Sequence, residues 1–176
     1  SEIDRSLVGS EMCIRASSYS MNKVNSYLSL IRFYNPIGFW LLLWPGLWGL
    51  FLTNSLEIDH FTIVVLGSFL TRSLGCAIND LLDHKYDREV DRTKDRPLAN
   101  GELSFAEGII FTALLGIGCL YLLSLTNVFV ICFAAIIAIP MILLYPLMKR
   151  FLGIPQLFLG LTFGLSLPIS LSLIHI

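Results

Sequence analysis

Charged residues are scarce in this chain. They make up 14% of its 176 residues, whereas a typical soluble domain has about 25%. Hydrophobic residues reach 55% and the mean hydropathy is +0.74. This composition excludes an ordinary soluble domain and is typical of a chain that crosses a membrane several times. The net charge of −1 also gives no reason to expect a nucleic-acid partner.

The cysteines show no spacing typical of a metal site or a disulfide framework. There are four of them, at Cys13, Cys76, Cys119 and Cys132. All but Cys13 lie in apolar runs, where packing as small apolar side chains is expected. No redox compartment follows from them.

The N-terminal segment lacks the basic and apolar regions of a signal peptide. Its polarity differs sharply from the rest of the chain, so we expect residues 1–17 to be a non-native or disordered leader. The last apolar run has no polar flank, which indicates truncation. We therefore expect residues 18–176 to form the N-terminal part of one membrane domain.

Long apolar runs give the fold class. Runs of about 18 or more apolar residues indicate transmembrane helices, and backbone polar groups in lipid must be satisfied within each helix. The sequence therefore predicts an all-α, multi-span transmembrane bundle. Five spans are expected, near Pro36–Thr53, Phe61–Ile78, Ala106–Leu125, Val128–Leu147 and Ile154–Ile176.

Positive charge alternates along the chain. Lys and Arg occur before span one, between spans two and three, and at Lys149 and Arg150, but not in the turns at residues 54–60 and 124–127. Positively charged loops stay on the inner side of a membrane. We therefore expect the loop after span two to face the cytoplasm of a bacterium, or the matrix if the membrane is the mitochondrial inner membrane.

Three features of the spans predict local structure. The aromatic residues of span one, among them Trp40, Trp44 and Trp48, could face a cation, but a belt at the lipid interface is the simpler interpretation. Pro140 and Pro146 predict a kink in span four, before Lys149 and Arg150. The pair Gly160 and Gly164 in span five predicts a close helix–helix contact.

The densest group of charged residues follows span two, where residues 80–96 hold six acids and five bases. A helix can continue from span two to about Asp91, because no proline interrupts the chain before Pro97. At 100° per residue, Asn79, Asp83, Asp87 and Asp91 fall on one helical face. Asp80 lies beside them, and Arg72 lies on the same face about 10 Å deeper along the axis.

Several carboxylates on one face repel one another unless a cation joins them. Mg²⁺ is the natural partner, since it takes oxygen ligands and bridges one or two carboxylates to a substrate phosphate. The alternative is a solvated helix end held by ion pairs to Lys85, Arg88 and Arg92. Arg72 favours the metal site, because an ionisable residue within a span is costly and usually functional.

The bases that follow the acids suit a diphosphate. Arg92, Lys94 and Arg96 precede a turn at Pro97 and Gly101. Guanidinium and ammonium groups would bind the diphosphate oxygens that the metal leaves free.

The segment "NDLLDHKYD" fits the pattern N-D-x-x-D-x-x-x-D and resembles the first aspartate motif of the UbiA superfamily of intramembrane prenyltransferases. The blocks "IRFYNPIGFWLLLWPGLWGL", "DRTKDRPLANG" and "YPLMKRFLGIPQLFLGLTFG" agree with it, and the resemblance covers roughly residues 25–172. The blocks are most similar to the 4-hydroxybenzoate branch, which serves ubiquinone biosynthesis.

The resemblance implies a nine-helix bundle with two aspartate motifs that hold Mg²⁺ against a polyprenyl diphosphate. The prenyl group would be transferred to 4-hydroxybenzoate, ortho to its hydroxyl, within the lipid bilayer; no protein partner is implied. Asn79, Asp83 and Asp87 would bind the metal, with Asp83, Asp87 and Arg72 in catalytic positions. Basic or orienting positions near the substrates would be Asp80, Lys94, Arg96, Lys149 and Arg150.

One part of the family pattern is missing, because the sequence contains no second D-x-x-x-D cluster. We therefore expect the chain as given to be inactive alone. Acceptors such as homogentisate, dihydroxynaphthoate, haem or chlorophyllide remain alternatives. A CDP-alcohol phosphotransferase would carry glycine-paired aspartates, and a transporter would spread its charges over several spans.

Overall fold

The computed structural model describes residues 23–53, 57–144 and 155–174, and all regular structure within them is helical. Residues 1–17, Lys149 and Arg150 lie outside this described part. Residues 23–30 form a short helix. The main elements then follow as α2 (Ile37–Leu52), α3 (Ile58–Asp87), α4 (Phe105–Ser124), α5 (Val128–Phe133), a π-helix η1 (Ala134–Ala138), α7 (Pro155–Gly164) and α8 (Ser166–Ile174).

The prediction of an all-α membrane bundle is confirmed. Three helical segments are long and apolar enough to cross a membrane, at Ile58–Asp87, Phe105–Ser124 and Gln156–Leu173, and two shorter apolar helices lie at Ile37–Leu52 and Val128–Leu144. Between 6% and 28% of the most apolar windows of the three long segments is buried inside the protein. Their exposed apolar surface is what lipid would cover.

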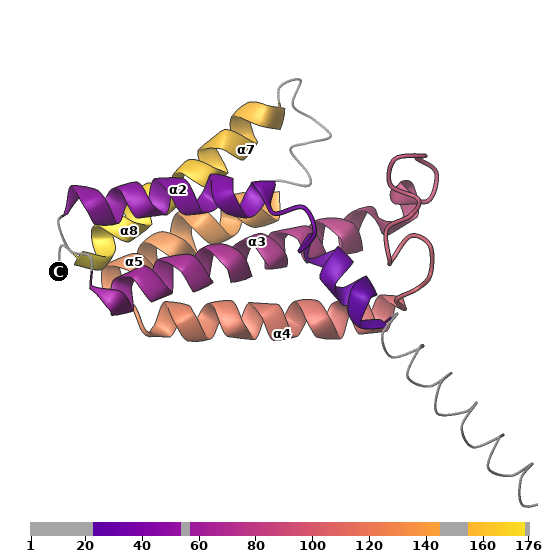
Figure 1. The fold of residues 1–176 in the computed structure, drawn as a ribbon, viewed down its shortest axis with the longest axis horizontal. Helices are drawn as coiled ribbons and strands as arrows, with labels where there is room; N and C mark the ends of the chain where they lie inside the picture. Colours follow the sequence, from indigo (N-terminus) through magenta and orange to yellow (C-terminus); the bar gives the residue numbers. More distant parts are fainter. Residues whose placement is uncertain (1–22, 54–56, 145–154, 175–176) are drawn as a thin grey trace, which may run out of the picture.

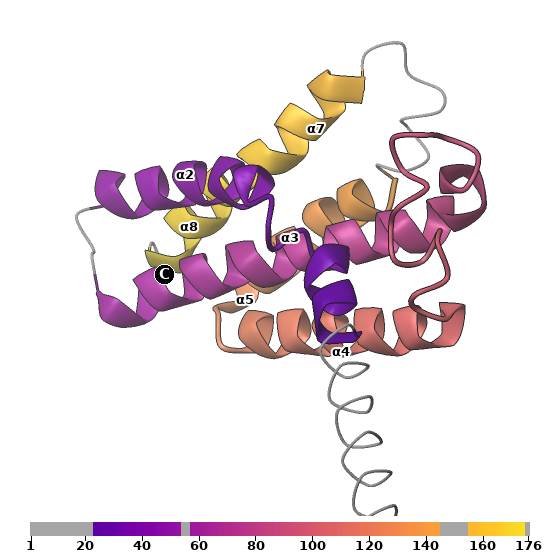
Figure 2. The same ribbon diagram turned by 45° about the vertical axis from the view of Figure 1, so that its right-hand side comes forward.

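The helices run back and forth between two ends of the molecule (Figure 1). The loop after α3 and the helix 23–30 lie at one end, and the turn between α4 and α5 lies at the other. The view in Figure 2 shows the same arrangement, with α3 between α2 and α4. All of the charged loop is therefore at one rim of the bundle.

Small residues allow α2 and α8 to pack closely. A Cβ atom at Gly46 would lie 2.9 Å from Ser166 Oγ, and one at Gly49 would overlap Ser170 Oγ. The Ser166 hydroxyl donates a 2.6 Å hydrogen bond to the carbonyl of Leu42. The close contact predicted at Gly160 and Gly164 is not found among the described residues, where a Cβ atom at either position would meet nothing within 4 Å.

Pro140 follows a turn that departs from the regular α-helix, and Pro146 lies outside the described residues. The preceding turn is the π-helix η1, in which the Ile139 N–H donates to the carbonyl of Ala134. Proline has no N–H to donate to the carbonyl four residues earlier, and one extra residue in the turn is a common accommodation.

The predicted extension of the helix to Asp91 is wrong, since α3 ends at Asp87. Residues 88–104 instead form a series of turns. The buried hydroxyl of Thr93 donates to the carbonyl of Asp87 at 3.1 Å. A side chain from the loop thus satisfies one of the carbonyls that the helix end leaves without a partner.

Candidate functional site

Carboxylates occupy the buried face of the last three turns of α3. Asp80, Asp83 and Asp87 have exposed fractions of 1%, 4% and 7%. Their spacing of three and four residues continues the buried positions Ser73 and Cys76 of the preceding turns. Burying a carboxylate is costly unless it is paired and hydrogen-bonded, so this face requires positive partners.

Two arginines from outside α3 supply these partners. Arg96 Nη1 lies 3.0 Å from Asp80 Oδ1 and 2.6 Å from Asp87 Oδ2. Arg32 Nη2 lies 2.9 Å from Asp80 Oδ1 and 3.2 Å from Asp80 Oδ2. The four side chains therefore form one continuous chain, in the order Arg32, Asp80, Arg96, Asp87.

The fold of the loop explains how Arg96 reaches the acids. Leu98 and Leu103 are buried with Leu30 and Ala77 in a small apolar cluster, which fixes the loop against α3 and the helix 23–30. The Arg96 N–H donates to the carbonyl of Thr93 at 3.1 Å. The burial of these apolar side chains against α3 and the helix 23–30 thus holds the Arg96 guanidinium at the acidic face.

Asn79 is half-buried beside this cluster. Its side-chain amide donates to Asp80 Oδ1 over 3.5 Å, at the limit of a hydrogen bond. Its amide oxygen therefore lies next to the carboxylates, in the turn before Asp83.

The other bases named from the sequence occupy different surroundings. The guanidinium of Arg72 lies against Gly38 of α2, and its Cζ lies 5.9 Å from the ring centroid of Phe163 of α7. Lys94 is exposed and its Nζ pairs with Asp91 at 2.9 Å. Asp91 itself is exposed on the loop and not on the acidic face. Lys149 and Arg150 lie outside the described residues.

The tryptophans of α2 face outward. Trp40, Trp44 and Trp48 are 49%, 51% and 57% exposed. This placement fits an aromatic belt against lipid and interface, and does not direct these rings toward the acidic face.

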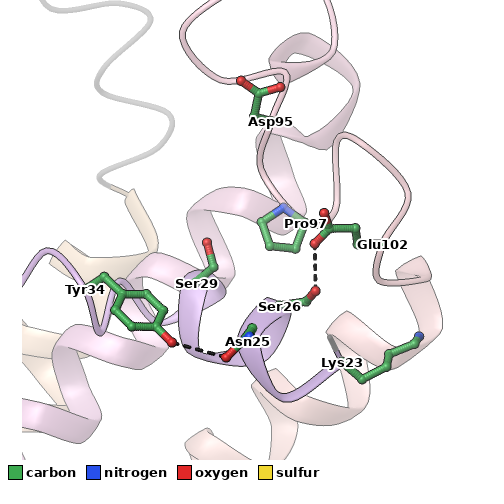
Figure 3. A pocket seen from close by; sticks show the side chains of 8 residues that line it. All are labelled: Lys23, Asn25, Ser26, Ser29, Tyr34, Asp95, Pro97 and Glu102. Atoms are coloured by element: carbon green, nitrogen blue, oxygen red, sulfur yellow. Dashed lines mark hydrogen bonds between the residues drawn. The ribbon is translucent and has the colours of Figure 1, made fainter. Parts of the chain in front are cut away.

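Two cavities in the described part of the chain are lined by residues outside the cluster. A polar cavity of about 700 Å³ lies between the helix 23–30 and the loop. Figure 3 shows the residues that line it, which are Lys23, Asn25, Ser26, Ser29, Tyr34, Asp95, Pro97 and Glu102. An apolar cavity of about 320 Å³ lies deeper in the bundle, between α3, α4, α5 and α8. Gly67 and Thr71, by which α3 lines part of it, lie on another face from Asp83 and Asp87.

Arg32 is the member of the cluster that the sequence did not single out. It is the last base before span one, and the distribution of positive charge places it at the same rim as Arg96. A buried acid at that rim needs a counter-charge. This requirement predicts that some base at the rim pairs with the acid, but it does not identify Arg32 as that base.

Comparison with known proteins places this cluster in a family. The model of the UbiA prenyltransferase family matches residues 42–175, well over half of the chain. The chain belongs to the UbiA prenyltransferase family. The acidic face of α3, Arg96 and all helices from α3 to α7 fall within the matched residues, whereas Arg32 precedes them.

Curated relatives narrow the resemblance within the UbiA prenyltransferase family. Proteins named 4-hydroxybenzoate octaprenyltransferase are 41% identical over 150 residues in Polynucleobacter asymbioticus, 42% over 154 in Marinomonas sp. and 43% over 155 in Vibrio vulnificus. These alignments cover 84–86% of this chain and 52–54% of the relatives. The chain thus spans about half the length of the curated relatives it matches. No solved structure matches it.

UbiA prenyltransferases generally depend on Mg²⁺, and the donors on α3 suit this ion in part. Asn79, Asp83 and Asp87 offer one amide and two carboxylate groups, and Mg²⁺ commonly takes one or two carboxylates together with water and substrate phosphate. Within residues 23–53, 57–144 and 155–174, no three Asp, Glu, His or Cys side chains converge as a metal cage would require. The described residues thus fit one side of a site that a phosphate would complete.

Proposed function

We propose that this protein transfers a polyprenyl group from polyprenyl diphosphate to 4-hydroxybenzoate, ortho to the hydroxyl, in ubiquinone biosynthesis. The observation that carries the proposal is the buried acidic face of α3 with Arg96 bound across it, at one rim of an apolar bundle. Family membership favours prenyl transfer over a CDP-alcohol phosphotransferase or a transporter. The names of the relatives support the acceptor.

In this proposal Asn79, Asp83 and Asp87 are the Mg²⁺ ligands. The bound ion would neutralise charge on the diphosphate as it leaves. The two carboxylates are one helical turn apart on a buried face, so a rigid helix would fix their separation before the substrate binds. Burial also keeps water from competing for the diphosphate oxygens.

The bases are proposed to stabilise the same leaving group. Arg96 already lies at Asp80 and Asp87, and its remaining guanidinium N–H groups would bind the diphosphate. Arg72 lies deeper along α3, and its guanidinium would face the reacting end of the prenyl chain. The other bases of the proposed binding surface are Lys94, Lys149 and Arg150.

The reaction exchanges one bond for another. The bond between the prenyl C1 and the diphosphate oxygen breaks, and the electron pair leaves with the diphosphate. The allylic carbon then forms a bond with the ring carbon ortho to the hydroxyl, and that carbon loses its proton. An apolar surrounding protects the allylic cation from water, which explains why such chemistry belongs in a membrane protein.

The domain and its orientation complete the proposal. Residues 18–176 would be the N-terminal part of one prenyltransferase domain, whose second aspartate motif lies elsewhere in the complete protein. The loop 88–104 would face the cytoplasm of a bacterium or the mitochondrial matrix, on the inner membrane. This follows from its four bases at residues 88–104 and the absence of Lys and Arg from the turn at 124–127.

The test is a transfer assay on membranes that contain the complete protein. Labelled 4-hydroxybenzoate, a polyprenyl diphosphate and Mg²⁺ should give a prenylated acid, and chelation of Mg²⁺ should abolish it. Homogentisate and dihydroxynaphthoate serve as competing acceptors. Faster transfer to either would overturn the assignment of 4-hydroxybenzoate as the acceptor. Transfer to none of the three would overturn prenyl transfer as the function. Residues 18–176 alone should give no turnover. Turnover by them would refute the prediction that they hold only half of the metal site.

A further inference from the structure

Arg32 occupies a backbone position that normally takes glycine. The helix 23–30 ends in a turn where the Arg32 N–H donates to the carbonyl of Ser29 at 3.0 Å and the Phe33 N–H donates to that of Leu28 at 2.9 Å. These two bonds define a Schellman motif with Arg32 at its left-handed residue. Its φ of 60° is the single positive value of a non-glycine residue in the described part of the chain.

This conformation costs energy, which glycine at the same position would avoid. The arginine side chain uses the conformation to reach α3, where Nη2 contacts both oxygens of Asp80. Asp80 is 1% exposed, whereas the Arg32 side chain is 27% exposed. Replacing a buried ion pair by apolar residues is often neutral or stabilising, so stability alone does not account for this arrangement.

The segment that carries Arg32 is fixed to the loop that carries Arg96. Ser26 Oγ donates to Glu102 of the loop at 2.7 Å (Figure 3). Within the segment itself, the Tyr34 hydroxyl donates to Asn25 Oδ1 at 3.2 Å. Lys23 Nζ pairs with Glu107 at the start of α4 at 2.7 Å. The turn at Arg32 is therefore held from both sides, and the guanidinium meets Asp80 from a defined direction.

We propose that Arg32 is a positioning residue that acts through Asp80. By holding both oxygens of Asp80, it directs the carboxylate toward Arg96, and Arg96 in turn is oriented across Asp87. The inference rests on the proposed function, because it assigns to Arg32 the alignment of the acidic face for a Mg²⁺-bound diphosphate. Arg32 itself would not touch the substrate.

Four variants of the complete protein in membranes test this role. Arg32→Gly relieves the backbone and removes the guanidinium, and Arg32→Lys keeps a single nitrogen that can reach Asp80. Asp80→Asn and the double variant Arg32→Gly/Asp80→Asn complete a cycle. Arg88→Ala, which removes an exposed arginine just after α3, is the matched control.

We expect Arg32→Gly to lower kcat by about 10- to 100-fold, since small misplacements at a site have effects of this size. The KM for the polyprenyl diphosphate should change by less than about threefold, because only a group that binds the substrate in its ground state would raise it. Arg32→Lys should recover most of the rate. In the Asp80→Asn background Arg32→Gly should have little further effect, and Arg88→Ala should behave as wild type.

The opposite pattern would overturn the role. A normal rate for Arg32→Gly, no recovery by Arg32→Lys, or an equal loss in the Asp80→Asn background would each exclude action through Asp80. A selective rise in KM would make Arg32 a substrate ligand instead.

A readout without turnover separates this inference from the proposed function. In the unliganded protein, the thermal unfolding temperatures of Arg32→Gly, Asp80→Asn and the double variant should be non-additive. Additive changes in the unfolding temperature would show that Arg32 and Asp80 do not interact, even if the protein is an active enzyme. Non-additive changes in a protein that transfers no prenyl group would instead retain the coupling and refute the function.

Discussion

At the scale of single residues, Arg96 is the base that joins two carboxylates of the acidic cluster. One of its nitrogens contacts both Asp80 and Asp87, and its side chain is 19% exposed. Removing one partner of a buried ion pair leaves the other charge uncompensated, which is more damaging than replacing both. Arg96 therefore contributes to the unliganded fold as well as to the proposed diphosphate site.

We expect Arg96→Gln to lower the free energy of unfolding by about 2 kcal/mol, the usual range for hydrogen bonds to charged groups. It should also lower prenyl transfer by about 10- to 100-fold. Arg96→Lys should give intermediate values, because one ammonium replaces a fork of donors. Thermal unfolding in detergent and the transfer assay measure the two effects. Unfolding unchanged from wild type would show that the ion pairs do not form in the protein.

Gly38 provides a second residue-scale test. A Cβ atom there would overlap the guanidinium of Arg72, so Gly38→Ala should displace Arg72 from Phe163. We expect transfer to fall by about tenfold or more. Gly75→Ala is the control, because a Cβ atom at Gly75 would meet no other described residue within 4 Å. Equal rates for the two variants would remove Arg72 from the proposed site.

The sequence predicted the acidic face but not its partners. Helical periodicity alone placed Asp83 and Asp87 on one face, and both are buried on α3. Arg32 is 48 residues from Asp80 in the chain, and periodicity carries no information about a contact between separate elements. The end of α3 was misjudged because no proline or glycine marks it in the sequence; the helix ends at Asp87, and the Thr93 hydroxyl then donates to the carbonyl of that residue.

At the scale of elements, helix packing depends on small residues in places that the sequence did not indicate. The pair Gly160 and Gly164 has the familiar spacing, yet both positions are open among the described residues. Gly46 and Gly49 instead receive two serines of α8. Small residues four apart predict a helix face that another helix can approach closely. Which helix approaches it depends on the fold of the whole chain.

This difference gives a matched pair of variants. Gly49→Ala introduces a methyl group at Ser170, and we expect a loss of about 1–3 kcal/mol, the usual cost of overpacking. Gly160→Ala introduces the same group into open space and should be neutral or slightly stabilising, because alanine favours a helix. Thermal unfolding in detergent compares them. A larger loss for Gly160→Ala would show that α2 and α8 do not form the close contact.

At the scale of the whole molecule, the charged segments gather at one rim of the bundle. The loop after α3 and the helix 23–30 lie at the same end, opposite the turn between α4 and α5 (Figure 1). This arrangement and the positive-inside rule predict the same orientation. The substrate phosphate would then enter from the aqueous side where the bases are.

The orientation is testable with single cysteines in a background that lacks the four native ones. The variants Arg92→Cys and Thr126→Cys place one cysteine on the loop after α3 and one on the opposite turn. A membrane-impermeant thiol reagent applied to intact bacteria should label Thr126→Cys but not Arg92→Cys. The reverse labelling would overturn the proposed topology while leaving the fold unchanged.

The central claim is that the buried acids of α3 form one half of a Mg²⁺–diphosphate site. The most direct measurement compares prenyl transfer to 4-hydroxybenzoate by wild type, Asp83→Asn, Asp87→Asn and Asp91→Asn of the complete protein, at equal protein levels in membranes. We expect the first two variants to lose at least about 100-fold, the usual effect of removing one group that stabilises developing charge. Asp91→Asn should remain near wild type, because α3 ends before Asp91 and its side chain is exposed. Near-normal transfer by Asp83→Asn and Asp87→Asn would contradict the account.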